Sequence, residues 1–123
     1  MVDINLTPAV VNISGVRAGD RNLFNLTLRS AGKPMDLTGY TVLAQARTTV
    51  QASTELDAVC TVTDPAGGGI SVRWPGDAVR TWLGSDNTKS GLWDLQLDDG
   101  SGGDPWTIIS GNFEAEMDIT RTP

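Results

Sequence analysis

The sequence predicts an all-β domain, an antiparallel sandwich of two stacked sheets with one short helical turn. Apolar and polar residues alternate with a period of two in six segments, which is typical of strands that have one buried face. Clusters of Gly, Pro, Asp and Ser separate these segments, and 14 Gly and 6 Pro favour short strands joined by tight turns. At 123 residues the chain is long enough for one domain.

The alternating segments follow one another along most of the chain. In the first, Phe24, Leu26 and Leu28 share one face and polar residues share the other. The other segments repeat this pattern at residues 40–47, 56–62, 70–74, 93–97 and 109–116. Strands of this kind belong to antiparallel sheets with one packed and one wet face.

Turn sequences lie between the predicted strands. A hairpin is expected at 31–34, a turn at 64–69 and the longest flexible loop at 98–105. Seven or more short strands with turns at regular spacing indicate a sandwich of immunoglobulin type.

The helical signal is short and covers residues 75–84. Asp77 is the expected N-cap, Val79, Trp82 and Leu83 form one apolar face, and Gly84 ends the helix. We expect one or two turns that cover the end of the sandwich.

The N-terminal segment stands apart from the alternating pattern. We assign residues 1–15 to an N-terminal arm or edge strand and residues 16–123 to the immunoglobulin-like domain. The arm is apolar at Ile4, Leu6, Val10 and Val11 and is interrupted by Pro8. Such an arm either pairs along an edge of its own domain or lies on a neighbour. We expect an assembly contact with another copy or another protein.

Charge and composition limit the partners. The net charge is −6, and residues 63–123 supply the whole deficit, because residues 1–62 contain five acids and five bases. An acidic surface repels phosphate backbones, so nucleic acid is not an expected partner. The sequence has no apolar run long enough for a membrane span and no basic, apolar leader. We therefore expect synthesis in the cytoplasm and no membrane partner.

Catalytic residue types are scarce. The chain has no His and one Cys, which leaves no Ser-His-Asp or Cys-His arrangement and no zinc ligand set. Cys60 falls on the apolar side of its segment, where a structural thiol is expected. We expect no enzymatic activity, no cofactor and no small-molecule substrate.

Two weaker signals point to a ligand-facing loop. Asp98, Asp99 and Asp104 lie in the Gly-rich 98–105 loop, which does not match a calcium-binding register, so a flexible hairpin loop is the favoured interpretation over an ion site. Trp106 follows this loop. The other three tryptophans, Trp74, Trp82 and Trp93, fall on faces expected to be buried.

The order of short motifs resembles a known family. Val16-Arg17-Ala18-Gly19-Asp20 precedes the first alternating strand, and Met35-Asp36-Leu37-Thr38-Gly39-Tyr40 opens the second. Gly91-Leu92-Trp93-Asp94-Leu95-Gln96-Leu97 and the end, Ser110 to Ala115 and Asp118 to Arg121, complete the series. This order, over residues 16–122, resembles the immunoglobulin-like β-sandwich domains of phage tail and baseplate proteins, such as the N-terminal domain of baseplate upper proteins.

The resemblance implies a structural subunit of a bacteriophage virion, in the tail, baseplate or head, with other virion proteins and copies of itself as partners. Many domains of this family begin a longer chain, whereas this sequence ends at Pro123, so the resemblance implies the particle rather than a position within it. The alternative is a carbohydrate-binding or host-adhesion module on the same sandwich. That alternative needs two exposed Trp rings beside the acidic loop, and the orientation of Trp74 and Trp106 separates the two hypotheses.

Overall fold

The computed structural model describes residues 9–30 and 32–119 and confirms the predicted all-β sandwich. The first six strands are β1 (Ala9–Val10), β2 (Ile13–Arg17), β3 (Leu23–Thr27), β4 (Arg29–Ser30), β5 (Lys33–Pro34) and β6 (Thr41–Arg47). The remaining elements are β7 (Leu56–Asp57), β8 (Val59–Asp64), β9 (Gly69–Arg73), α1 (Gly76–Leu83), β10 (Thr88–Asp98) and β11 (Trp106–Glu116).

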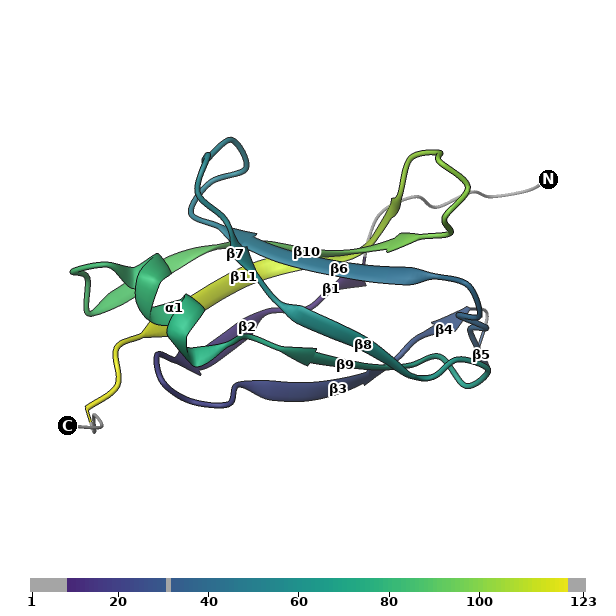
Figure 1. Cartoon of the computed structure of the whole chain (residues 1–123), viewed down its shortest axis with the longest axis horizontal. Helices are drawn as coiled ribbons and strands as arrows, with labels where there is room; N and C mark the ends of the chain where they lie inside the picture. Colours follow the sequence, from purple (N-terminus) through teal and green to yellow (C-terminus); the bar gives the residue numbers. More distant parts are fainter. Residues whose placement is uncertain (1–8, 31, 120–123) are drawn as a thin grey trace.

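The strands form two layers (Figure 1). The larger sheet has the order β1-β11-β10-β6-β7, and β2 also pairs with β11. The smaller sheet has the order β3-β9-β8, and β4 and β5 form a separate hairpin. The helix α1 lies at one end of the sandwich, whereas the β10–β11 loop and the β4–β5 hairpin lie at the other.

The core lies between the two sheets and under α1, where the period-two alternation places the apolar side chains. Trp74, Leu95, Leu97 and Phe113 are fully buried. The aromatic rings pack closely: the Trp74 centroid lies 4.7 Å from that of Phe113 and 6.2 Å from that of Trp93. The inward faces that the alternation predicts are therefore confirmed for β6, β9, β10 and β11.

The predicted strand at 56–62 is divided between the two sheets. β7 pairs with β6 in the larger sheet, and β8 pairs with β9 in the smaller one. The crossover occurs at Ala58, whose amide donates to the Ala44 carbonyl at 3.0 Å before the chain turns away. Alternation continues unbroken through this point, and this is why the sequence pattern resembles one strand.

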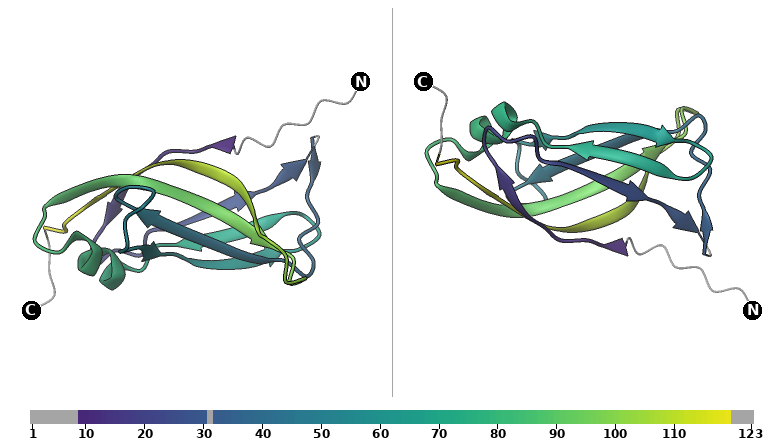
Figure 2. Two further views of the ribbon diagram at one scale, coloured as in Figure 1. Left: turned by 90° about the horizontal axis from the view of Figure 1, so that it is seen from above. Right: turned by 90° about the horizontal axis from the view of Figure 1, so that it is seen from below.

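The N-terminal segment adds a parallel edge to a sheet that was expected to be antiparallel. β1 and then β2 follow the same edge of β11 in the parallel direction (Figure 2). Parallel pairing is open to them because these strands are far apart in the sequence and no short turn has to connect them to β11. The expected boundary between residues 15 and 16 falls inside β2, so the strand belongs to the sandwich.

The helix agrees with the prediction except at its start. Val79, Trp82 and Leu83 are buried, and Gly84 ends the helix with a φ of 63°. The N-cap is Pro75 rather than Asp77, and no side chain caps the helix. Because the helix begins earlier than expected, Asp77 lies in its first turn, 3.8 Å from Arg80. Within the described residues no helix is long and apolar enough to cross a membrane.

Candidate functional site

The acidic loop makes hydrogen bonds to its own backbone. Asp98 Oδ1 accepts from the Gly100 amide, and Asp99 Oδ1 accepts from the Ser101 amide, both at 2.9 Å. The bonds from Ser101 hold the pKa of Asp99 below its usual value. Asp104 is exposed. Within the described residues no three His, Cys, Asp or Glu side chains are grouped to hold a metal ion.

Trp106 is the exposed tryptophan. It is 51% exposed and its ring lies 5.9 Å from that of Tyr40, at the same end of the sandwich as the loop. Trp74, Trp82 and Trp93 are buried, as predicted. Because Trp74 is fully buried, it does not join Trp106 in the pair of exposed Trp rings that a sugar-stacking platform needs.

The predicted assembly arm is described only in part. Ile4 and Leu6 lie outside the described residues. Val10 is 72% exposed, whereas Val11 is partly buried against the core. The Val11 amide donates to the Ser110 carbonyl at 3.0 Å, so this part of the segment pairs along an edge of its own domain, which is one of the two arrangements expected for it. An assembly contact through Val10 and Val11 stays a prediction.

A kink at Val11 and Asn12 fastens this segment to the sandwich. The Val11 carbonyl turns inward and accepts a hydrogen bond from the indole Nε1 of Trp93 at 2.7 Å. It passes so close to Gly111 that a Cβ atom there would collide with it. Beside it, the Asn112 amide of β11 donates to the side-chain oxygen of Asn12 at 3.0 Å, instead of to a backbone carbonyl. The described part of the arm is therefore an edge strand of its own domain.

Cys60 is half-buried and faces the core side of β8, as predicted. Burial raises the pKa of its thiol to about 11, so almost no thiolate forms near neutral pH. This thiol is suited to packing rather than to reaction.

The structure brings together a surface that the sequence analysis did not select. On the outer face of the larger sheet, Leu43 of β6 is 50% exposed and Leu92 of β10 is 40% exposed. Val10 and Val50, which are 72% and 78% exposed, lie at the same surface. We call it the outer hollow; it has a volume of about 640 Å³ and is lined by Val10, Asn12, Leu43, Gln45, Arg47, Val50, Leu92, Trp93, Asp94, Gln96, Ser110, Gly111 and Asn112.

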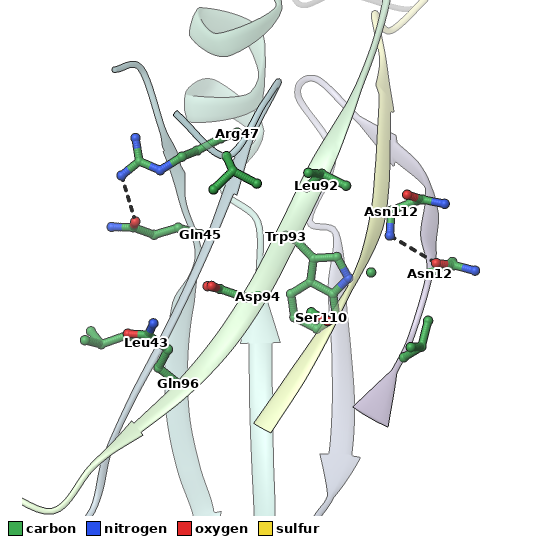
Figure 3. Close-up of a pocket in the computed structure, with 13 residues that line it drawn as sticks. Asn12, Leu43, Gln45, Arg47, Leu92, Trp93, Asp94, Gln96, Ser110 and Asn112 are labelled. Carbon is green, nitrogen blue, oxygen red and sulfur yellow. Dashed lines mark hydrogen bonds between the residues drawn. The ribbon is translucent and has the colours of Figure 1, made fainter. Parts of the chain in front are cut away.

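Polar side chains lie among the apolar ones in the outer hollow (Figure 3). The guanidinium of Arg47 is already engaged: it donates to the Ala52 carbonyl at 2.6 Å and to Gln45 Oε1 at 3.2 Å, and lies 3.4 Å from Glu55. Asp94 lies in the middle of this surface. Burial raises the pKa of its carboxyl group, an effect that the charge of Arg47 offsets in part.

A signal for this surface exists in the sequence. Leu43 and Leu92 occupy positions where the alternation points outward, between residues that point inward. A large apolar side chain at an outward position has no role in the core of its own domain. The grouping itself depends on the strand register, which sets Leu43 opposite Gln96 and Gln45 opposite Asp94.

The outer hollow combines apolar and polar side chains. Its apolar side chains lie among amide, hydroxyl, guanidinium and carboxylate groups. An exposed apolar patch with a polar surround is typical of protein interaction sites.

The chain was compared with protein families, curated proteins and solved structures. No family model matches the chain, and no curated protein matches it. Among solved structures, the chain is similar to the N-terminal domain of phage TP901-1 ORF48, with a TM-score of 0.44 and 15% sequence identity over 91% of this chain and 85% of that chain.

Proposed function

We propose that this protein is a structural subunit of a bacteriophage virion that acts through protein-protein contacts and has no catalytic activity. The observation that carries the proposal is the outer hollow, where exposed apolar side chains of β1, β6, β10 and the loop after β6 gather over a sheet face that its own domain leaves uncovered. The order of motifs over residues 16–122, which resembles phage tail and baseplate domains, supports the virion as the place of assembly.

The contact has the composition that assembly requires. Burying Leu43 and Leu92 would remove apolar area from water, which is favourable by roughly 25 cal/mol for each Å² buried. The polar side chains of the outer hollow supply donors and acceptors that fix the orientation of a partner. The proposed partners are other virion proteins and copies of this chain.

The carbohydrate-binding alternative has one observation in its favour. Trp106 and Tyr40 form a partly exposed aromatic pair near the acidic loop. Weak sugar binding that is lost in Trp106→Ala and kept in Leu43→Glu would favour the alternative.

The test replaces an outward leucine with a charged residue. We expect Leu43→Glu to fold normally and to be absent from purified particles assembled with the variant in place of the wild type. Ile119→Glu is the matched control, because Ile119 is 87% exposed and is not among the residues that line the outer hollow. Normal incorporation of Leu43→Glu, detected by immunoblot of the particles, would contradict the proposal.

A further inference from the structure

The smaller sheet carries a second apolar surface on the opposite side of the sandwich. Its strand register sets Arg73 of β9 directly between Leu23 of β3 and Val59 of β8. Leu23 is 48% exposed and Val59 is 47% exposed, and Arg73 is exposed between them. Side chains directly opposite one another on adjacent strands are neighbours at about 5 Å, so the three form one row.

Arg73 is available for a partner. Within residues 9–30 and 32–119 its guanidinium makes no hydrogen bond or ion pair. The outward side chains closest to it along the register, Asn25, Ser71 and Thr61, are uncharged. The outer face of the smaller sheet therefore presents a positive charge flanked by two apolar side chains.

The outer hollow presents the opposite arrangement. Asp94 lies between Leu92, two residues before it on β10, and Leu43, diagonally across on β6. Its carboxylate makes no hydrogen bond within the described part of the chain, and the nearby Arg47 is held by Gln45, Glu55 and the Ala52 carbonyl. The outer hollow therefore presents a negative charge flanked by two apolar side chains.

We propose that the partner seated on the outer hollow is a second copy of this chain, which places the Leu23-Arg73-Val59 row of its smaller sheet over Asp94, Leu43 and Leu92. This inference rests on the proposed function and names the partner of the same surface. The two faces lie on opposite sides of the sandwich, so the contact is head to tail and leaves one free face of each kind at the ends of a pair. Such a contact closes into a ring or continues as a stack.

Arginine suits this position for a physical reason. A guanidinium is less strongly hydrated than an ammonium and forms two parallel hydrogen bonds with a carboxylate. The flanking leucines and valine exclude water from that pair, and the pair in turn sets the register of the two faces.

A charge swap between two variants tests this arrangement. In Asp94→Arg the outer hollow repels Arg73 of a neighbour, and in Arg73→Asp the smaller sheet repels Asp94. Two copies of the same variant therefore meet with like charges, and each variant alone loses the contact. In a mixture, the altered hollow of the first variant meets the altered row of the second with opposite charges. The native Arg73 of the first variant also meets the native Asp94 of the second, so every contact is restored in an alternating assembly.

The measurement is sedimentation velocity at low ionic strength, where surface charges are least screened, with protein up to about 1 mM. We expect wild type to self-associate and each variant to weaken association by roughly tenfold or more. We expect the equimolar mixture to recover the wild-type behaviour. The pair Asp104→Arg and Arg29→Asp is the control, because it makes the same charge changes at exposed residues that belong neither to the outer hollow nor to the Leu23-Arg73-Val59 row, and it should leave association intact. Near-ultraviolet circular dichroism establishes that each variant is folded.

A monomeric wild type, single variants that associate like wild type, or a mixture that stays monomeric would each overturn the inference. These outcomes are distinct from failure of the proposed function, which is measured by incorporation into particles. Loss of incorporation in Leu43→Glu together with a monomeric wild type would mean that another virion protein occupies the outer hollow.

Discussion

The two faces of β10 differ in what their residues do for the domain. Trp93, Leu95 and Leu97 point inward and are at most 2% exposed, whereas Leu92 is 40% exposed on the outward side of the same strand. The inward residues belong to the core that holds the sandwich together. The outward residues Leu92, Asp94 and Gln96 are exposed or half-buried and lie outside this core. A period of two thus separates residues that serve the fold from residues that are free to serve a partner.

The largest expected effect comes from removing an inward side chain. We predict that Trp93→Ala lowers the free energy of unfolding by about 3–5 kcal/mol, as large-to-small core substitutions do. The indole packs edge-on against Trp74 and Phe24 and bonds the Val11 carbonyl, and all three contacts are lost. Chemical denaturation measures the change.

The neighbouring outward residue is the matched control. Leu92→Ala should change the free energy of unfolding by about 0.5 kcal/mol or less, as surface substitutions do. Equal losses of unfolding free energy in Trp93→Ala and Leu92→Ala would show that the inward and outward faces of β10 contribute alike to stability.

A smaller effect is expected where the N-terminal edge meets the sheet. Gly111→Ala places a Cβ atom against the Val11 carbonyl, and we predict a loss of about 1–3 kcal/mol with faster exchange of the Val11 amide. The control is Gly103→Ala, because a Cβ atom there meets only Ser101 Oγ at 3.4 Å. Unchanged stability and unchanged amide exchange would show that residues 9–12 do not depend on this close approach.

The smallest effect concerns Asp94 in the dilute, monomeric protein. Its pKa is raised by burial, so the charged form is disfavoured in the folded state, and ionisation costs stability as pH rises above the ordinary value of 3.8. We predict that Asp94→Asn is equally or slightly more stable than wild type at pH 7, and that the difference disappears at lower pH. A variant clearly less stable than wild type at pH 7 would mean that the carboxylate is already stabilised within its own domain.

The sequence predicts the buried face of most strands because one-sided burial leaves a period-two signature. Local turn chemistry also follows from short sequence patterns: in the motif at 35–40 the Thr38 amide donates to Asp36 at 3.0 Å, and Gly39 adopts a positive φ. The start of the helix lies earlier than predicted, because Pro75 sets the entry to the helix and leaves Asp77 inside it.

Long-range pairing was beyond the sequence pattern. Nothing local distinguishes a strand that changes sheets at Ala58 from one that continues, and nothing local marks β1 and β2 as parallel partners of β11. The outer hollow has the same origin: Leu43, Leu92 and Asp94 come together through cross-strand register and not through sequence spacing. The acidic, Gly-rich composition of the loop pointed to Asp98, Asp99 and Asp104. In the structure, the Asp98 and Asp99 carboxylates accept hydrogen bonds from backbone amides of the same loop.

Hydroxyl-radical footprinting of the protein in intact particles and in dilute solution tests whether the outer face of the larger sheet is a contact surface. Leu43 and Leu92 should be oxidised readily in solution and protected in particles, while Ile119, 87% exposed and away from the outer hollow, reports on general shielding. We predict protection of the two leucines well beyond that of Ile119. Equal oxidation of Leu43 and Leu92 in the particle and in solution would contradict it.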